Sequence, residues 1–353
     1  MAFEKPHILG GVELDVFLAS RPGVQVFDQY QGLLEELCEI RNPSVRDPLL
    51  FAPLWAEFLG DHGGADLRAQ GSWVFFPWNN KLVHYLPQEL HDELRTARNR
   101  NIITAEEQKL FRECAVGIAG LSVGSHAALT LAMMGGCNTM KLADPDVVSG
   151  SNLNRIRLGF SAVGQRKVDL AAQIIYEMNP YADLHLFPSG ISKENFEQFV
   201  NVGKRIAVFL EEMDNLGLKI EVRKWARALR IPVLMVTDNA DGVIVDVERY
   251  DLEPDLPIFA GRLKDIPEGD LAGLGPADKI RIASQIVDVA AIEPRMLASV
   301  HEVGKTLNSW PQLATAATTA GVALAYLVKL ISLRQKLVSG RTTISFDSLF
   351  AHS

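Results

Sequence analysis

The stretch from residue 115 to residue 125, Ala-Val-Gly-Ile-Ala-Gly-Leu-Ser-Val-Gly-Ser, joins a short apolar run to a glycine-rich turn. The run at 115–119 is typical of a buried strand, and Ser125 to Met134 is expected to form a helix. A strand, a glycine-rich turn and a helix in this order begin a βαβ unit. The stretch therefore predicts an α/β fold.

Short apolar runs and helices continue to alternate after this stretch. This alternation predicts a mostly parallel, Rossmann-like sheet with helices on both faces. Further strands are expected at 140–143, 184–187, 205–210 and 232–236, and helices at 168–178 and up to Leu229. Segment 251–278 is rich in Pro, Gly and Asp, which predicts a long loop or crossover.

Residues 1–97 are interpreted as a small accessory α+β module, and residues 98–353 as the main domain. Apolar spacing predicts a helix at 31–40, and the runs 73–77 and 82–86 predict a β-hairpin. The hairpin could clamp a peptide by strand addition. It could equally be a structural cover for the sheet, and both interpretations stay open.

Composition narrows the classes of function. The 353 residues carry 35 Lys+Arg against 43 Asp+Glu, a net charge of −8, which argues against a nucleic-acid partner. The three cysteines form no CxxC pair, so we expect no zinc and no disulfide framework. The N-terminus has no apolar signal segment, and the apolar stretch 313–333 is expected to be a buried helix. We therefore expect a cytoplasmic protein without a membrane partner.

The glycine-rich turn can be compared with the nucleotide-binding pattern GxGxxG. Only Gly120 matches it cleanly, because Ser122 and Ser125 stand at the second and third glycine positions and Gly124 is displaced by one. Serines are small and donate hydrogen bonds, so binding of an anion at the start of the helix remains possible.

The same turn also matches GxSxG, the nucleophile elbow of the α/β-hydrolases. A hydrolase would use Ser122 as its nucleophile and would need an acidic residue and a histidine at the ends of later strands. The later histidines do not follow strands in that order: His185, His301 and His352. The Ser122 hydrolase is therefore the less favoured alternative.

Downstream motifs resemble those of the ThiF/MoeB superfamily, the ubiquitin-activating-enzyme-like adenylyltransferases. Residues 144–155, Asp-Pro-Asp-Val-Val-Ser-Gly-Ser-Asn-Leu-Asn-Arg, follow that family's D-x-D-x-V-x-x-S-N-L-N-R signature. Residues 163–167 follow its V-G-x-x-K, Asp214-Asn215 its D-N, and 98–103 its R-Q-I-type arm. The resemblance covers roughly residues 98–250.

The resemblance implies binding of ATP with Mg²⁺ and adenylation of a carboxylate, which gives an acyl-adenylate and pyrophosphate. Arg155 and Lys167 would hold the phosphates, and Asp214 would hold Mg²⁺. Arg100 would reach a phosphate, in this family often across a homodimer interface. The residues implied for catalysis are Arg155, Lys167, Asp214 and Arg100. Those implied for nucleotide binding are Gly120, Ser122, Gly124, Asp144, Asp146 and Asn152, with Asp144 on the ribose.

The sequence departs from the family in ways that refine the expected activity. The glycine turn is altered, and no cysteine follows Asp214, where thioester- or persulfide-forming members carry one. We therefore expect adenylation of a peptide or small-protein C-terminus, or of a small acid, without a covalent cysteine relay. A nucleotide- or peptide-binding module that has lost catalysis is the alternative hypothesis.

Overall fold

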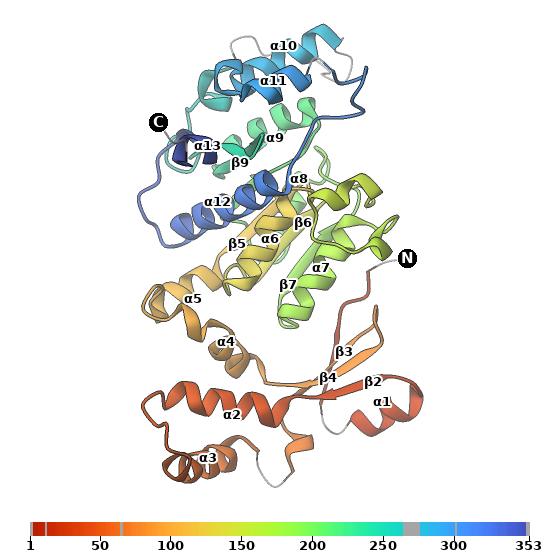
Figure 1. Ribbon diagram of the computed structural model, residues 1–353, viewed down its shortest axis with the longest axis vertical. Coiled ribbons are helices and arrows are strands. Elements are labelled where there is room, and N and C mark those ends of the chain that lie inside the picture. Colours follow the sequence, from red (N-terminus) through yellow and green to blue (C-terminus); the bar gives the residue numbers. More distant parts are fainter. Residues whose placement is uncertain (1–2, 11–12, 64–65, 264–275, 301, 351–353) are drawn as a thin grey trace. The chain divides into compact units, whose positions relative to one another are not determined.

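The computed structural model describes residues 3–10, 13–63, 66–263, 276–300 and 302–350 (Figure 1). The chain forms two compact units. The first comprises Met1–Gln108 and Ile175–Tyr181, and the second comprises Lys109–Ile174 and Ala182–Ser353.

The first unit contains a four-stranded sheet in the order β1-β3-β4-β2. Its strands are β1 (His7–Leu9), β2 (Gln25–Asp28), β3 (Ser72–Phe76) and β4 (Lys81–Tyr85). Its helices are α1 (Leu14–Ser20), α2 (Tyr30–Arg41), α3 (Pro48–Gly63) and α4 (Gln88–Thr96). The predicted hairpin is confirmed, because β3 pairs antiparallel with β4, and the helix expected at 31–40 is α2.

Both strands of the hairpin are paired on both sides. β3 also pairs with β1, and β4 also pairs in parallel with β2. A peptide therefore cannot add a strand to the hairpin itself, and could do so only along the outer edge of β1 or β2.

A buried histidine joins the parts of this small sheet. His84 on β4 is fully buried, and its Nδ1 lies 2.9 Å from Asp28 Oδ1 while its Nε2 lies 2.8 Å from the Gln70 carbonyl. Its ring stacks on Trp73, with centroids 4.2 Å apart. Both ring nitrogens have partners, so His84 is a structural residue of the core.

The second unit is built on a seven-stranded sheet in the order β11-β10-β9-β8-β5-β6-β7. Its strands are β5 (Ala115–Ala119), β6 (Thr139–Ala143), β7 (Asp183–Phe187), β8 (Val208–Glu211), β9 (Val233–Asn239), β10 (Gly242–Glu248) and β11 (Gly340–Ile344). Strands β5 to β9 pair in parallel, whereas β10 and β11 are antiparallel additions. The predicted α/β class with a mostly parallel Rossmann-like sheet is confirmed.

Helices cover both faces of this sheet (Figure 1). The remaining helices are α5 (Ala105–Glu113), α6 (Gly124–Met133), α7 (Lys167–Met178), α8 (Phe196–Asn201), α9 (Leu216–Ala228), α10 (Pro276–Val287), α11 (Pro294–Val300), α12 (Ala314–Ser332) and α13 (Phe346–Phe350). On β5, a Cβ on Gly117 would lie 2.5 Å from the Phe199 ring of α8, whereas the next residue, Ile118, contacts Gly124 of α6. Because neighbouring strand residues point to opposite faces, α6 and α8 lie on opposite sides of the sheet.

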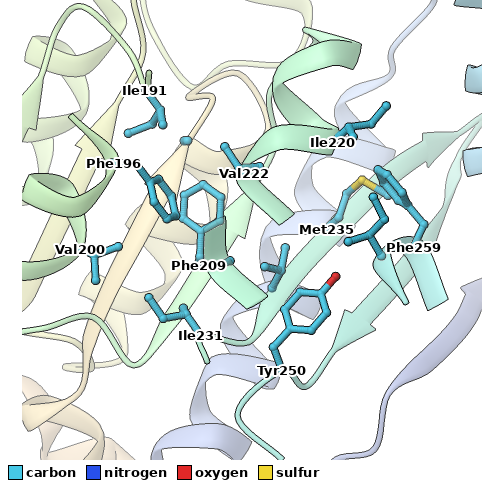
Figure 2. Close-up of a cluster of buried hydrophobic side chains, with 14 of the residues drawn as sticks. Ile191, Phe196, Val200, Phe209, Ile220, Val222, Ile231, Met235, Tyr250 and Phe259 are labelled. Atoms are coloured by element: carbon cyan, nitrogen blue, oxygen red, sulfur yellow. The ribbon is translucent and has the colours of Figure 1, made fainter. Parts of the chain in front are cut away.

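The α8 and α9 face holds a large apolar cluster (Figure 2). Phe196 of α8 packs edge-to-face on Phe209 of β8, with ring centroids 5.7 Å apart. The cluster continues through Met235 of β9 to Phe259, in a short turn at Ile258–Gly261.

The other face is closed by α12, which packs on α6, β9 and β10. Among the described residues α12 is one helix with the length and apolar composition of a membrane span. Its buried residues are mostly small, and at Gly321 a Cβ would lie 2.4 Å from His126 Cβ of α6. The helix expected at 313–333 is confirmed, with one face in the core.

The long loop expected at 251–278 is described only in part. The turn Ile258–Gly261 lies within it, with positive φ at Phe259 and Ala260. Helix α10 already begins at Pro276, two residues before the expected end. Residues 264–275 lie outside the described residues.

The buried amine of Lys141 lowers the stability of the folded protein by an amount that depends on pH. This side chain on β6 is fully buried, and its Nζ donates to the Val200 carbonyl at 2.8 Å. Burial, opposed in part by Asp183, lowers the pKa of Lys141 from 10.5 to about 8. The unfolded chain therefore binds more protons between these two values, so stability rises with pH across that window.

We predict that Lys141→Met stabilises the protein at pH 7 by about 1–2 kcal/mol, since it removes the cost of charging a buried amine. The gain should shrink as pH rises above 8 and vanish above pH 10.5, once the lysine has lost its proton in the unfolded chain as well. Urea unfolding at pH 7 and pH 10 measures it, with the exposed Lys336→Met as control. A variant less stable than the wild type at pH 7 would contradict the prediction.

Candidate functional site

The order of the strands marks one position on the second unit's sheet. The chain runs from β5 to β6 and β7 on one side, then crosses back to β8 and β9 on the other. The boundary between β5 and β8 is thus a topological switch point, and ligands of open α/β sheets bind outside the carboxyl ends of the strands there. The glycine-rich turn follows β5, and the segment with Asp214 follows β8.

The glycines of the turn permit close packing. Gly120 has φ +89°, and a Cβ on it would lie 2.2 Å from the Glu212 carbonyl oxygen in the loop after β8. Gly124 begins α6, and a Cβ there would lie 2.8 Å from Ile118 Cγ2. Two loops that flank the switch point are therefore held against each other at Gly120.

Asp144 fastens the other side of the turn. It is buried, its Oδ2 accepts from the Leu121 amide at 2.6 Å, and its Oδ1 accepts from the Asp146 amide at 2.8 Å. Burial raises the pKa of Asp144, while these amides and Lys167 oppose the change. Lys167 Nζ lies 2.8 Å from Asp146 Oδ2 and 3.9 Å from Asp144 Oδ2.

Arg155 links the turn to the second half of the site. Its Nε donates to Ser122 Oγ at 3.1 Å, and its Nη1 donates to Asn154 Oδ1 at 2.9 Å. Burial lowers the pKa of Arg155, and the negative charges of Asp238 and Asp214 oppose that effect. The hydrogen bonds to Ser122 and Asn154 thus hold the guanidinium in place, and its charge also attracts the two carboxylates.

Asp214 stands exposed in the turn before α9. The helix is capped by its neighbour Asn215, whose side chain accepts from the Leu218 amide at 2.9 Å. Asp214 is thus not the N-cap, and its carboxylate faces the Arg155 charge.

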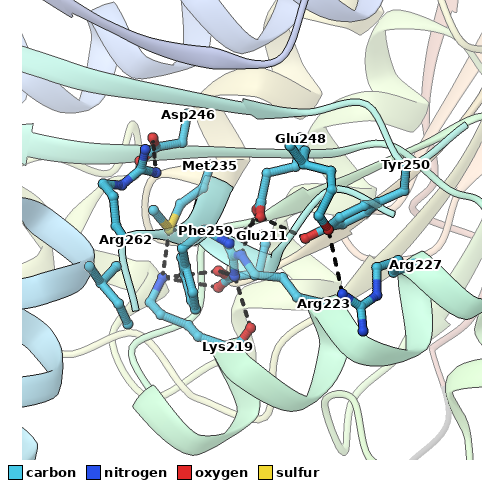
Figure 3. A network of polar contacts seen from close by, with 12 residues as sticks. Glu211, Lys219, Arg223, Arg227, Met235, Asp246, Glu248, Tyr250, Phe259 and Arg262 are labelled. Carbon is cyan, nitrogen blue, oxygen red and sulfur yellow. Dashed lines mark hydrogen bonds and ion pairs between the residues drawn. The ribbon is translucent and has the colours of Figure 1, made fainter. Parts of the chain in front are cut away.

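A buried ion-pair network holds the start of this loop (Figure 3). Glu211, at the end of β8, accepts from Arg223 at 2.6 Å and from Lys219 at 3.0 Å. It also accepts from the Met213 amide at 3.0 Å, which fixes the chain just before Asp214. Burial alone would raise the pKa of Glu211, but the two cations outweigh it and leave that pKa below its ordinary value.

The next residue, Glu212, has a different role. Its Oε1 accepts from the Val236 amide of β9 at 2.8 Å, so its side chain bridges two strands of the sheet. Burial raises its pKa well above the ordinary value for a glutamate. The pair of glutamates before Asp214 is therefore accounted for by the structure.

Asp238 also belongs to the candidate site, although no sequence motif marked it. It lies near the end of β9 and is only 6% exposed. Its Oδ2 accepts from Gln312 at 2.9 Å. Burial raises the pKa of Asp238 to about 6, Arg155 opposes the rise, and Asp214 adds to it. The expected strand ended at Val236, yet an acidic residue just beyond it was the signal that had also marked Asp144.

Most of the sequence-predicted residues lie on the loops around the switch point. Those of the second unit are Gly120, Ser122, Gly124, Asp144, Asp146, Asn152, Arg155, Lys167 and Asp214. Asn152 has a structural task there, since its Oδ1 accepts from the Ser149 amide in a capping box. Arg100 is not among them, because it belongs to the first unit, where it donates to Glu93 at 3.1 Å.

The described residues around Ser122 do not resemble a hydrolase triad; His301 and His352 lie outside the described part of the chain. The Ser122 hydroxyl accepts from Arg155, a cation that cannot serve as a general base. His185 pairs with Asp183 at the start of β7, at the amino edge of the sheet and thus opposite to Ser122.

Comparison with known proteins gives the family. The model of the ThiF family matches residues 96–348. The chain belongs to the ThiF family. The superfamily suggested by the sequence motifs is thereby confirmed.

Three relatives illustrate the range of similarity. Protein MT1398 of Mycobacterium tuberculosis (strain CDC 1551 / Oshkosh) is 40% identical over 78% of this chain and 38% of its own length. The tRNA threonylcarbamoyladenosine dehydratase of Bacillus subtilis is 28% identical over 48% of this chain and 68% of its own. The adenylyltransferase and sulfurtransferase uba4 of Pyricularia oryzae is 37% identical over 24% of this chain and 17% of its own. The match thus spans less than two fifths of the mycobacterial relative.

We predict that Gly120→Ala destabilises the second unit by at least about 2 kcal/mol, because it combines an unfavourable φ with a clash against Glu212. The substitution should also weaken the binding of any ligand that is held between the two loops. Gly159→Ala is the control, since its φ is −87° and no atom lies within 4 Å of the added Cβ. Thermal unfolding compares the two, and an equal effect would contradict the packing role of Gly120.

Proposed function

We propose that this ThiF-family chain is an enzyme that binds ATP with Mg²⁺ and adenylates a carboxylate. The observation that carries the proposal is the chain of contacts from Lys167 and Asp144, through the glycine turn, to Arg155, whose charge in turn attracts Asp214. These residues come from separate loops but meet at the switch point of the sheet. The adenylyltransferase named among the relatives supports the same chemistry.

In the proposed reaction, a carboxylate oxygen of the acceptor attacks the α-phosphorus of ATP. The new O–P bond forms as the bond from the α-phosphorus to the bridging oxygen breaks, and pyrophosphate leaves with that electron pair. Negative charge builds on the phosphate oxygens, so fixed cations stabilise the transition state most effectively. Arg155 and Lys167 would supply these cations. Ion pairs with Asp146 and Asp144 hold Lys167 in position beforehand, and hydrogen bonds to Ser122 and Asn154 hold Arg155.

The residues also fit a magnesium ion. Among the described residues no group of three or more His, Cys, Asp or Glu could form an all-protein cage. Mg²⁺ is usually held by one or two carboxylates together with substrate phosphates and water. Asp214 does not cap α9, so its exposed carboxylate could supply such a ligand. The bound ion would neutralise part of the phosphate charge.

The positions of the cysteines support adenylation without a cysteine relay. The sequence has three, and all are buried. Cys114 immediately precedes β5, and Cys137 lies just before β6, so both lie at the amino edge of the sheet. Cys38 belongs to the first unit.

The acceptor is proposed to be a peptide or small-protein C-terminus, or a small acid. A homodimer in the cytoplasm, in which Arg100 reaches the partner's nucleotide, also belongs to the proposal. Because one relative is named for a modified tRNA, an acceptor screen should include tRNA beside peptides and small acids.

We predict that Arg155→Ala and Lys167→Ala each lower acceptor-dependent ATP–pyrophosphate exchange by about 100-fold or more, as expected for loss of a charge that stabilises the transition state. Asp214→Ala should abolish the dependence of ATP binding on Mg²⁺. Exchange assays and calorimetry measure these effects, with the exposed Lys193→Ala as control.

Two results would count against adenylation. If the wild type binds ATP but exchanges no pyrophosphate with any acceptor, the inactive binding module becomes the better description. If Arg155→Ala and Lys167→Ala match the Lys193→Ala control in exchange, the nucleotide does not use this site.

Ser122 separates adenylation from hydrolysis. Its hydroxyl only orients Arg155 in our proposal, so Ser122→Ala should lower exchange by roughly tenfold, which corresponds to the roughly 1.5 kcal/mol at the lower end for a hydrogen bond to a charged group. A fluorophosphonate probe should not label the wild type. Labelling that disappears in Ser122→Ala would instead establish a serine hydrolase.

A further inference from the structure

Asp238 is an unusual buried carboxylate. Its Oδ2 is held by Gln312, but its Oδ1 is buried and has no hydrogen-bond partner within the described part of the chain. Buried polar atoms are nearly always paired, since an unpaired one costs the full loss of its hydration. The buried, charged Oδ1 of Asp238 is therefore a position at which a bound ligand would supply the missing partner.

The electrostatic surroundings of Asp238 indicate what kind of ligand fits. Arg155 attracts its charge, whereas Asp214 repels it. Arg155 also serves Ser122 and Asn154, so it does not neutralise both acids. Two carboxylates that share one engaged cation leave excess negative charge between them, which a divalent cation would balance.

The charge of the whole site leads to the same conclusion. Around the switch point Asp144 and Asp146 share Lys167, and Asp214 and Asp238 share Arg155. Four carboxylates thus face two cations before any phosphate arrives. A nucleoside triphosphate can enter such a site only together with additional positive charge. Carboxylate oxygen ligands select a hard cation such as Mg²⁺.

We propose that Asp238 is a second protein carboxylate for the divalent cation, acting together with Asp214. The inference rests on the proposed function for the presence of a nucleotide, but the metal site itself can be tested without turnover. Gln312, two residues before α12, positions Asp238 by holding Oδ2 and leaving Oδ1 for the ion. An ammonium group of the acceptor is the competing occupant, and the experiment distinguishes it.

The first measurement is the binding of Mn²⁺ alone to the full chain. The concentration of free Mn²⁺ is monitored by electron paramagnetic resonance. We expect Asp238→Asn and Asp214→Asn each to weaken Mn²⁺ binding at least tenfold. Asp241→Asn is the matched control, because it makes the same charge change in the turn between β9 and β10, where Asp241 is exposed and accepts from Thr315. Equal Mn²⁺ affinity of Asp238→Asn and the control would overturn the proposal, as would a wild type that binds no Mn²⁺.

The second measurement is the ratio of affinities for α,β-methylene-ATP with Mn²⁺ and with EDTA. Asp238→Asn should reduce this ratio at least tenfold while leaving the affinity in EDTA within threefold. A variant that keeps the ratio but requires more acceptor for exchange would identify Asp238 as an acceptor-binding residue and overturn the metal role. A wild type that binds Mn²⁺ through Asp238 but binds no nucleotide would refute the proposed function and leave the metal site standing.

The third measurement is stability without metal, which detects a merely structural role. Asn keeps the size of the side chain and can still accept from Gln312. Because the charge of Asp238 is unfavourable where it stands, Asp238→Asn should raise the melting temperature of the metal-free protein and lose most of the stabilisation that added Mn²⁺ gives the wild type. A lower melting temperature in EDTA, with metal binding intact, would show that Asp238 serves the fold instead.

Discussion

The buried guanidinium of Arg223 is the interaction on which the second unit depends. It joins Glu211 of β8 to Glu248 of β10, each at 2.6 Å, and lies 3.9 Å from the ring centroid of Phe259 (Figure 3). Arg223 and both glutamates are almost completely buried. Loss of one partner from such a network leaves an uncompensated charge that costs about 3–5 kcal/mol. The end of β8, helix α9, strand β10 and the turn at 258–261 must therefore assemble together.

This network determines the site because Glu211 is also the last residue of β8, directly before the loop that leads to Asp214. Its carboxylate holds the Met213 amide, the Glu212 carbonyl packs on Gly120, and the Glu212 side chain holds β9. On the other side of the turn, Asp144 holds the Leu121 amide. The loops at the switch point are thus fixed by main-chain contacts to buried acids. Preorganisation of this kind allows fixed charges to stabilise a transition state without rearrangement.

The sequence predicted the elements whose signal is local. Strand β5 occupies the expected residues 115–119, because an unbroken apolar run bounded by a glycine is sufficient to define a buried strand. The antiparallel β10 and β11 were not predicted, and β9 was expected to end three residues early, because Asp238 and Asn239 look like turn residues. Their place in a strand follows from pairing with β10, which is a tertiary contact.

The candidate site shows the same division. Motifs predicted Arg155, Lys167 and Asp214 as candidates, because the spacing of a strand end from a helix start is visible in a single chain. They could not explain Glu211 and Glu212, whose partners lie on α9, β9 and β10. Nor could they show that Asp144 and Asn152 already hold main-chain amides. A residue type at a motif position indicates a site. The partners of that residue elsewhere in the fold determine how many of its hydrogen-bonding atoms and how much of its charge remain available to a ligand.

The two sets of buried acids in this unit differ in how completely they are satisfied, and that difference separates structure from function. Glu211 and Glu248 have cationic partners on charged oxygens, and Glu248 also accepts from the Tyr250 hydroxyl at 2.6 Å. Such a fully satisfied network stabilises the folded protein without any ligand. Within the described part of the chain, Asp238 retains an unpaired oxygen and is repelled by a like charge, so its position is unfavourable until something binds. A fold under selection only for stability would place Asn or an apolar residue there. The incompletely satisfied acid therefore belongs to the ligand-bound state, and the satisfied acids are the framework that holds it in place.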